Sequence, residues 1–237
     1  MTDTPTRHAV VEADLREQWD ALLAWVEQLD DTAFDEPSVL PGWSVGDLVA
    51  HLGIAMNGLT VCEPIDGPTD ERRLEIGDYI GQYGDSASST SARTVAESQR
   101  IASDRVAGIE AEGTRAFTHL DQLHRGGPDP LVRSRRGPMR LSDVVMTRLI
   151  ELVVHADDLA RSVPVTSPVD PTARTLVAEE FLRLLNSRAG TQVVVGDERT
   201  WVRLASGRLA WRERGDALRP GALSDGLPDL SAHLPLL

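Results

Sequence analysis

The sequence contains a single cysteine, no lysine and no long apolar run. With Cys62 alone, the chain can form no internal disulfide and no zinc site built from cysteines, and a reducing cytoplasm suits such a chain. No apolar stretch has the length of a transmembrane helix, and the N-terminal stretch lacks the apolar core of a secretory signal. These absences predict a cytoplasmic protein, and any metal that it binds must be held by His, Asp or Glu.

The charge balance is strongly acidic. The 237 residues include 37 Asp and Glu and 24 basic residues, all of them arginine, for a net charge of -13. This charge opposes binding to the phosphate backbone of nucleic acids and to anionic lipid. We therefore expect neither nucleic acid nor a membrane as a partner, whereas the sequence leaves the oligomeric state open.

Apolar residues at helical spacing predict four long helices before the C-terminal part of the chain. Ser44, followed by Asp47 three residues later, predicts the start of one of them, because this pair resembles a capping box. The polar connections between the helices favour an antiparallel bundle with long crossovers. The four predicted helices span residues 8–29, 45–61, 92–123 and 142–162.

Two polar segments connect the later helices. Segment 63–91 is rich in Pro, Gly, Asp and Ser, has room for a short helix at 72–83, and is the segment that we expect to flank an active site. Segment 125–140, RGGPDPLVRSRRGPMR, is expected to be a loop.

The C-terminal part has a different pattern. Residues 170–188 predict one more amphipathic helix, and TQVVV after Gly190 predicts a strand. The stretch TWVRLASGRLAWRERG cannot be assigned to helix or strand by its period. We therefore expect a mainly α protein with two domains, a helical bundle at 1–165 and a small α/β domain at 166–237.

Two histidines and a glutamate stand among apolar residues of two predicted helices. In IELVVHADDL, Glu151 and His155 are four residues apart and therefore project from the same side of a helix, one turn apart. That helix is apolar nearly all round, so it is predicted to be buried, where an unpaired carboxylate is costly. His51 in PGWSVGDLVAHL lies in the same situation. If the two helices are neighbours, the three side chains form a metal-ligand set with positions open for water or substrate.

Structural roles stay open for each of these residues. A Glu-x-x-x-His pair is often a plain intrahelical pairing, and a buried histidine often bonds a backbone carbonyl. The residues by themselves therefore leave metal binding and core packing as alternatives. The same donor set accepts zinc, nickel, iron or manganese.

The stretch PGWSVGDLVAHL, followed much later by ELVVHADDL, resembles the N-terminal metal-binding domain of the mycothiol-dependent maleylpyruvate isomerase family, a branch of the DinB-like four-helix bundles. The resemblance covers residues 7–162. It implies a DinB-like four-helix bundle in which His51, Glu151 and His155 bind a divalent metal, zinc in that family. It also implies that mycothiol, a low-molecular-weight thiol, is the cosubstrate.

The activity that the resemblance implies is a metal-dependent reaction of mycothiol with an electrophilic small molecule. A divalent cation lowers the pKa of a coordinated thiol and so favours the thiolate at neutral pH. Addition of the thiolate to a double bond, rotation and departure describe an isomerase, whereas a thiolate that stays attached describes an S-transferase. The alternative is a non-catalytic metal-binding or small-molecule-binding module on the same bundle.

The tail, with TWVRLASGRLAW and GALSDGLPDLSAHLPLL, resembles an abbreviated sterol-carrier-like domain. In the isomerases an arginine of the C-terminal domain orients a substrate carboxylate, a task that suits a guanidinium group. Arg208 is the first candidate for this role and Arg219 the second, with ordinary solvent exposure as the alternative for both. Trp43, just before the second helix, is expected either to wall the cofactor site or to pack as a staple.

Overall fold

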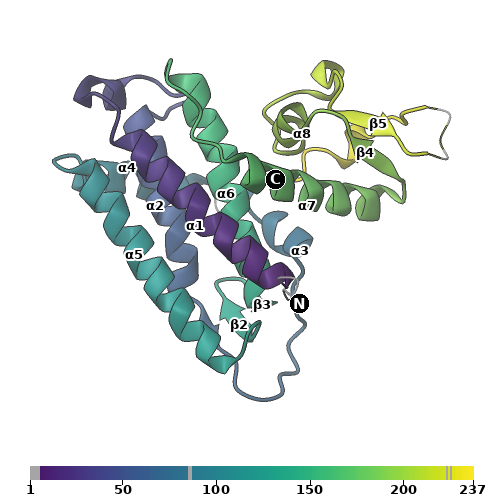
Figure 1. Cartoon of the computed structure of the whole chain (residues 1–237), viewed down its shortest axis with the longest axis horizontal. Helices are drawn as coiled ribbons and strands as arrows, with labels where there is room; N and C mark the ends of the chain where they lie inside the picture. The colour runs from purple at the N-terminus through teal and green to yellow at the C-terminus, as the bar shows by residue number, and fades with distance from the viewer. Residues whose placement is uncertain (1–5, 85–86, 223, 225) are drawn as a thin grey trace, which may run out of the picture.

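The protein is mainly α-helical, as the sequence predicts. The computed structural model describes residues 6–84, 87–222, 224 and 226–237. Four long helices form a bundle, and a smaller region with helices and a two-stranded sheet follows it in the chain (Figure 1). The long helices of the bundle are α1 (Arg7–Val26), α2 (Val45–Thr60), α5 (Arg105–Leu123) and α6 (Leu141–Ser162).

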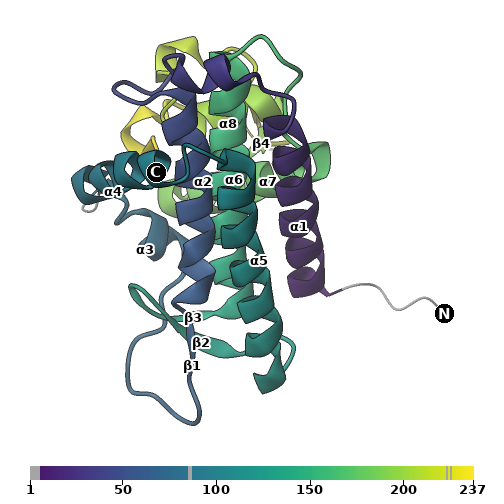
Figure 2. The same cartoon turned by 90° about the vertical axis from the view of Figure 1, so that its left-hand side faces the viewer.

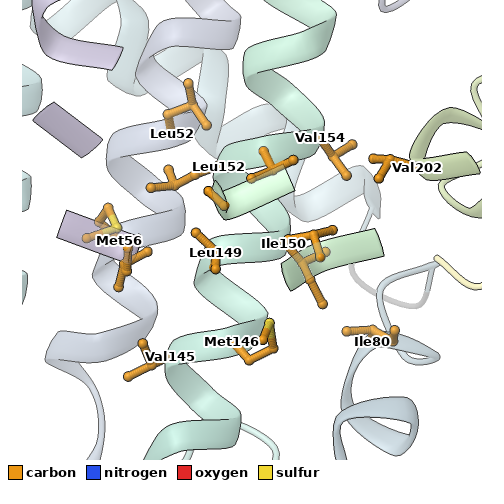
Figure 3. Close-up of a cluster of buried hydrophobic side chains, with 14 of the residues drawn as sticks. Leu52, Met56, Ile80, Val145, Met146, Leu149, Ile150, Leu152, Val154 and Val202 are labelled. Atoms are coloured by element: carbon orange, nitrogen blue, oxygen red, sulfur yellow. The ribbon is translucent and has the colours of Figure 1, made fainter. Parts of the chain in front are cut away.

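Helix α6 packs against α1 and α2, and α5 packs along α2 (Figures 1 and 2). The seam between α2 and α6 is apolar: Leu52 and Met56 of α2 lie beside Leu149 and Leu152 of α6 in one cluster of buried side chains (Figure 3). All four side chains are fully buried. Burial of side chains of this size contributes about 1.5–3 kcal/mol each, so the seam fixes the positions of α2 and α6 relative to each other.

Helix α2 begins at the capping box that the sequence predicts. The Asp47 amide donates to Oγ of Ser44 at 3.1 Å, and the Ser44 amide donates to the Asp47 carboxylate at 3.0 Å. Two amides that would otherwise lack a partner at the helix start are thereby bonded. The Asp47 carboxylate therefore serves the start of the helix.

The single helix predicted at 92–123 is wrong, because the structure contains two helices there. Helix α4 (Ala87–Arg100) packs against α2, and α5 begins only at Arg105. The chain turns between them, and the Ala107 amide donates to the Asp104 carboxylate at 3.0 Å, which caps α5. Asp104 is a preferred helix-start residue inside a pattern that otherwise looks continuous, so the sequence does contain the signal for the break.

The segment predicted as a loop at 125–140 contains a β-hairpin that leads directly into α6. Its turn joins Ser134 to Gly137, and Gly137 has a φ of 142°, a backbone conformation that residues with a side chain rarely adopt. A short strand from the segment after α2 extends this sheet. The three antiparallel strands are β1 (Glu63–Pro64), β2 (Leu131–Ser134) and β3 (Gly137–Arg140).

The short helix predicted at 72–83 is present as α3 (Ile76–Ile80) and is shorter than predicted. Its two terminal isoleucines are buried, and the helix packs against α6; Ile80 lies in the cluster of buried side chains of Figure 3. This packing places the following residues, including Tyr83, beside the bundle.

The C-terminal region combines helices and a sheet, as the sequence predicts. Its elements are α7 (Pro171–Ala189), β4 (Val193–Val195), α8 (Glu198–Ala205) and β5 (Leu218–Pro220), with β4 and β5 antiparallel. The strand predicted from TQVVV is β4. Of the unassigned stretch TWVRLASGRLAWRERG, residues 200–205 lie in α8, and the residues after them form turns and a short 3₁₀ helix. Trp201 of α8 is fully buried, and its Nε1 donates to the Ala178 carbonyl of α7 at 2.9 Å.

Helix α7 packs against α1 and α6, which joins the C-terminal region to the bundle. Gln18 of α1 is fully buried and bonds the backbone of Pro168 and Asp170, each at 2.9 Å.

None of the described helices is long and apolar enough to cross a membrane. The domain division at residue 165 stays a prediction. Short 3₁₀ turns lie at Asp31–Asp35, His124–Gly126, Trp211–Glu213 and Ser231–His233.

Candidate functional site

The structure brings His51, Glu151 and His155 together between α2 and α6, and we call these three residues the His–Glu–His cluster. Nε2 of His51 lies 3.5 Å from Oε2 of Glu151, and Nε2 of His155 lies 3.4 Å from the same oxygen. One ligand atom from each residue lies within 4.8 Å of the other two. Helices α2 and α6 are therefore neighbours, which is the condition for the predicted metal-ligand set.

Each imidazole of the cluster is held through its other ring nitrogen. Nδ1 of His51 lies 3.3 Å from Oγ1 of Thr94, and Nδ1 of His155 lies 3.0 Å from Oδ2 of Asp158. Thr94 and the Asp158 side chain are both fully buried. These partners orient both rings so that each Nε2 faces Glu151, the arrangement that metal-binding histidines adopt.

Burial and neighbouring charges set the protonation of the three groups. Burial lowers the pKa of His51 and outweighs its hydrogen bond with Glu151. Burial raises the pKa of Glu151, but hydrogen bonds and charges from His155 and His51 outweigh it and hold that pKa well below its ordinary value. Burial lowers the pKa of His155, but its hydrogen bonds with Asp158 and Glu151 raise it above the ordinary value. An ionised Glu151 and a neutral His51 are forms that bind a divalent cation.

The spacing of each histidine nitrogen from the Glu151 oxygen fits a metal ion. Metal–ligand bonds of about 2.0–2.2 Å at tetrahedral angles place neighbouring ligand atoms about 3.4 Å apart. The two distances to Oε2 of Glu151 are 3.4 and 3.5 Å, which is longer than a strong charge-assisted hydrogen bond. Two nitrogens and one carboxylate also match the ligand set of catalytic sites, which keep positions open.

The His–Glu–His cluster lines a cavity of about 340 Å³. Aromatic rings and arginines make up much of its wall, and Glu151 is the one acidic residue among the described residues that line it. An anionic or aromatic small molecule therefore meets complementary groups. Besides the cluster, the lining residues are Trp43, Ile54, Ala55, Gly58, Tyr79, Tyr83, Ser89, Thr90, Arg93, Arg135, Arg136 and Arg148.

Trp43 lies in the wall of this cavity. Its ring centroid is 5.0 Å from that of His51, and its Nε1 donates to Oγ of Ser91 at 3.1 Å. The hydrogen bond orients the indole, so the ring is held over the His51 side of the cluster. A role in binding a cofactor stays a prediction.

The two arginines predicted to bind a substrate carboxylate lie in different places. Arg208 is beside the cluster, where its Nη2 donates to Oδ2 of Asp158 at 2.8 Å. It lines a second cavity of about 230 Å³ that also includes Glu151 and His155 in its wall. Arg219 is exposed on β5 and is not among the described residues that line either cavity. This placement favours Arg208 for the predicted role.

Sequence reasoning missed a buried arginine, Arg148, at the floor of the larger cavity. Its Nη1 donates to the Ala55 carbonyl at 2.9 Å and its Nη2 to the Tyr83 hydroxyl at 3.1 Å. The side chain passes over Gly58, where a Cβ would lie 2.7 Å from Nη1. Arg148 precedes Glu151 by one turn on the same apolar helix, so the argument that singled out Glu151 applies equally to it.

Sequence reasoning also missed the contribution of α4, which carries Ser91, Arg93 and Thr94 to the cluster and its cavity. Ordinary serines and threonines carry no signal for such a role in a sequence. The expectation that segment 63–91 flanks the site agrees with the placement of Tyr79 and Tyr83 in the cavity wall.

The single cysteine and two other histidines do not line the cavity, and each has a structural partner. Burial raises the pKa of Cys62 to about 11, and its Sγ donates to the Gly58 carbonyl at 3.3 Å. A thiol that stays protonated is a poor nucleophile. Nε2 of His119 lies 2.8 Å from the Cys62 carbonyl, and Nε2 of His124 lies 2.6 Å from a Glu12 oxygen.

Residues 15–160 match the family model described as the mycothiol maleylpyruvate isomerase N-terminal domain. The chain belongs to this family. The matched residues contain the whole His–Glu–His cluster, and the resemblance drawn from the sequence motifs is thereby confirmed.

In fold, the chain of this family member is similar to a solved structure described as the crystal structure of the mycothiol-dependent maleylpyruvate isomerase. The TM-score is 0.55 at 17% sequence identity, over 94% of this chain and 93% of that chain. The likeness therefore extends past the matched family domain into the C-terminal region, and at this identity it concerns the fold alone. No curated protein matches the chain in sequence.

Proposed function

We propose that this chain is a metal-dependent, mycothiol-using enzyme that activates the thiol as a thiolate for addition to an electrophilic small molecule. Family membership supports the isomerase kind of reaction, as in maleylpyruvate isomerase, and S-transfer is the variant in which the adduct is kept. His51, Glu151 and His155 would hold the divalent cation, for which zinc is the expected identity. When bound, such a cation supplies a lowered thiol pKa at neutral pH.

One observation carries this proposal: the donor atoms of the His–Glu–His cluster converge within 4.8 Å on the wall of an accessible cavity. A structural metal site would be closed by a fourth protein ligand. Among the described residues, no other His, Cys, Asp or Glu belongs to this donor group. A thiol and an electrophile therefore have both a binding position and space.

The residues around the cluster have separate tasks in this reaction. Asp158 and Thr94 keep the two imidazoles oriented. Trp43 covers the His51 side and reduces the access of water, while Arg208 is placed to bind a substrate carboxylate from the second cavity.

The isomerisation needs no net redox change. A thiolate lone pair forms a C–S bond at one end of a conjugated double bond, and the π electrons move onto the carbonyl oxygen of the electrophile. The remaining carbon–carbon single bond rotates, the electrons return, and the C–S bond breaks to release the thiolate and the isomer. Donors near that oxygen, among them Arg148 and Tyr83 in the cavity wall, would favour the negative charge that develops on it.

The test is the metal content and thiol dependence of His155→Ala, with His124→Ala as a matched control. His124 is also a histidine, and it pairs with Glu12 away from the cavity. We expect the purified wild type and the control to contain one equivalent of metal by elemental analysis and to turn over maleyl-type electrophiles only with mycothiol added. His155→Ala should lose both properties.

Unchanged metal content in folded His155→Ala would contradict the ligand assignment. Full metal content in the wild type without thiol-dependent turnover of any electrophile would instead favour the non-catalytic binding module. Retention of the thiol in the product, measured by mass spectrometry, separates S-transfer from isomerisation.

A further inference from the structure

Two arginines from distant parts of the sequence meet at the larger cavity. Arg93 comes from α4 and Arg135 from the turn between β2 and β3, and both line the cavity. Burial lowers the pKa of Arg93, and the positive charge of Arg135 on the wall of the same cavity lowers it further. Within the described part of the chain, neither side chain has a hydrogen bond or an ion pair.

Both side chains are exposed, and the chain as a whole has a net charge of -13. Neighbouring arginines do have carboxylates: Arg133 of β2 makes two 2.7 Å bonds to Glu71, and Arg100 of α4 bonds Glu97 at 2.5 and 2.8 Å. Glu97 is the acidic residue whose charge acts on Arg93, and it already bonds Arg100. Two like charges left together cost stability, so a bound anion would relieve a repulsion that the described protein groups leave in place.

The rest of the cavity wall adds to the same charge. Arg136 stacks over Tyr79 and Tyr83, with its Cζ 5.0 and 5.2 Å from their ring centroids, and Arg148 is buried deeper in the cavity. The rings give the space between the arginines and the His–Glu–His cluster an aromatic surface. A flat conjugated chain with a negative end fits this combination.

We propose that Arg93 and Arg135 form an anion subsite that binds a carboxylate of the electrophilic substrate while its reacting carbon lies near the His–Glu–His cluster. The position of the reacting carbon near the cluster rests on the proposed function. The subsite is separate from Arg208, which lines the second cavity and whose Nε and Nη2 bond Asp158. What the inference adds to the proposed function is the assignment of these two arginines to the carboxylate end of the substrate.

The test measures binding of sorbate, a planar conjugated monocarboxylate, and of its uncharged counterpart sorbamide by calorimetry, with the full chain as purified and no thiol present. The variants are Arg93→Gln/Arg135→Gln and the control Arg133→Gln. Arg133 lies on the same hairpin, is bonded to Glu71 and is not among the residues lining the cavity.

We expect the wild type and Arg133→Gln to bind sorbate at least about tenfold more tightly than sorbamide, with the preference weakening as salt rises. In the double variant the preference should vanish while sorbamide affinity stays the same. No preference in the wild type, or an undiminished preference in the double variant, would overturn the subsite.

Repeating the titration after removal of metal with a chelator separates the subsite from the proposed function. The arginine-dependent preference should persist, because the charges of Arg93 and Arg135 do not depend on the metal. A preference that disappears with the metal would mean that the carboxylate binds at the His–Glu–His cluster, and the subsite would be rejected. If the purified protein contained no metal and showed no thiol-dependent turnover but still preferred sorbate to sorbamide, only the proposed function would be refuted.

Discussion

The helical bundle and the C-terminal region contribute to the site in different ways. The bundle supplies the whole His–Glu–His cluster, whereas the C-terminal region supports it through Arg208, which bonds Asp158 behind His155. A second arginine of that region, Arg203, bonds the adjacent Asp157 on the same helix. The bundle thus supplies the groups that meet at the site, while arginines of the C-terminal region bond the two aspartates that follow His155 on α6.

The largest effect is expected from breaking the core of the C-terminal region. Trp201→Ala removes a fully buried side chain and its hydrogen bond to the Ala178 carbonyl. We expect the free energy of unfolding to fall by about 3–5 kcal/mol, measured by chemical denaturation. The metal content of the folded variant should equal that of the wild type, because α2 and α6 carry the ligands. Loss of metal from the folded variant would show that the C-terminal region helps to build the cluster itself.

Asp158→Asn tests the contact between the two regions at the point nearest the cluster. The change keeps the shape but removes the charge that holds His155, Arg161 and Arg208. We expect metal affinity to fall by about 10–100-fold, the usual effect of losing a partner that orients a metal ligand. Competition with a chromogenic chelator measures this affinity. An unchanged affinity would show that Asp158 serves only the ion pairs.

Asp157→Asn is the matched control one residue away. Asp157 accepts two bonds from Arg203, at 2.7 and 2.8 Å, and it does not contact the cluster. We expect a loss of about 1–2 kcal/mol in unfolding free energy with unchanged metal affinity. Equal losses of metal affinity in the two variants would mean that the C-terminal region acts on α6 as a whole and not through His155.

The smallest effect is expected at the start of α6, where burial and then the charge of Glu75 raise the pKa of Asp143 to about 6. The pKa of Asp143 is higher in the folded protein than in the unfolded one. The free energy of unfolding therefore falls as pH rises from about 4 to 6. Asp143→Asn should therefore gain on the order of 1 kcal/mol at pH 7.5, after allowance for solvent screening and for the favourable helix dipole.

At pH 4 the same variant should show little gain over the wild type, since Asp143 is then largely protonated in the folded protein. Thermal melts of both proteins at the two pH values measure the difference. A gain of equal size at both pH values would show that packing, and not charge, limits stability at this position.

Regular helices were predictable from the sequence because their apolar period is local. The ranges expected for α1, α2, α6 and α7 agree with the structure to within a few residues, and Ser44 and Asp47 marked the start of α2 correctly. The short elements were not predictable in the same way. Half of the residues of the β2–β3 hairpin are Arg or Ser, so the hairpin lacks a clear alternation of apolar and polar residues, and its strands were not predicted.

The residues of the candidate site were also predictable from the sequence only in part. Glu151 and His155 were recognisable because a carboxylate and an imidazole one turn apart are costly on an apolar helix, and His51 because it stands in a motif. Thr94 carried no such signal, since a threonine on a polar helix has many equivalent roles. Its bond to His51 exists only because α4 folds back across α2.

The mainly α class, the helix that buries Glu151 and His155, and the family motifs follow from the sequence, because each depends on residues within a few turns of one another. The tertiary structure brings His51 beside them, as the resemblance implied, and it alone places Arg208 and not Arg219 there and puts Arg93 and Arg135 on the wall of one cavity. These encounters depend on the packing of separate helices and turns, and side-chain spacing along one element contains no information about the partner that packing brings to it.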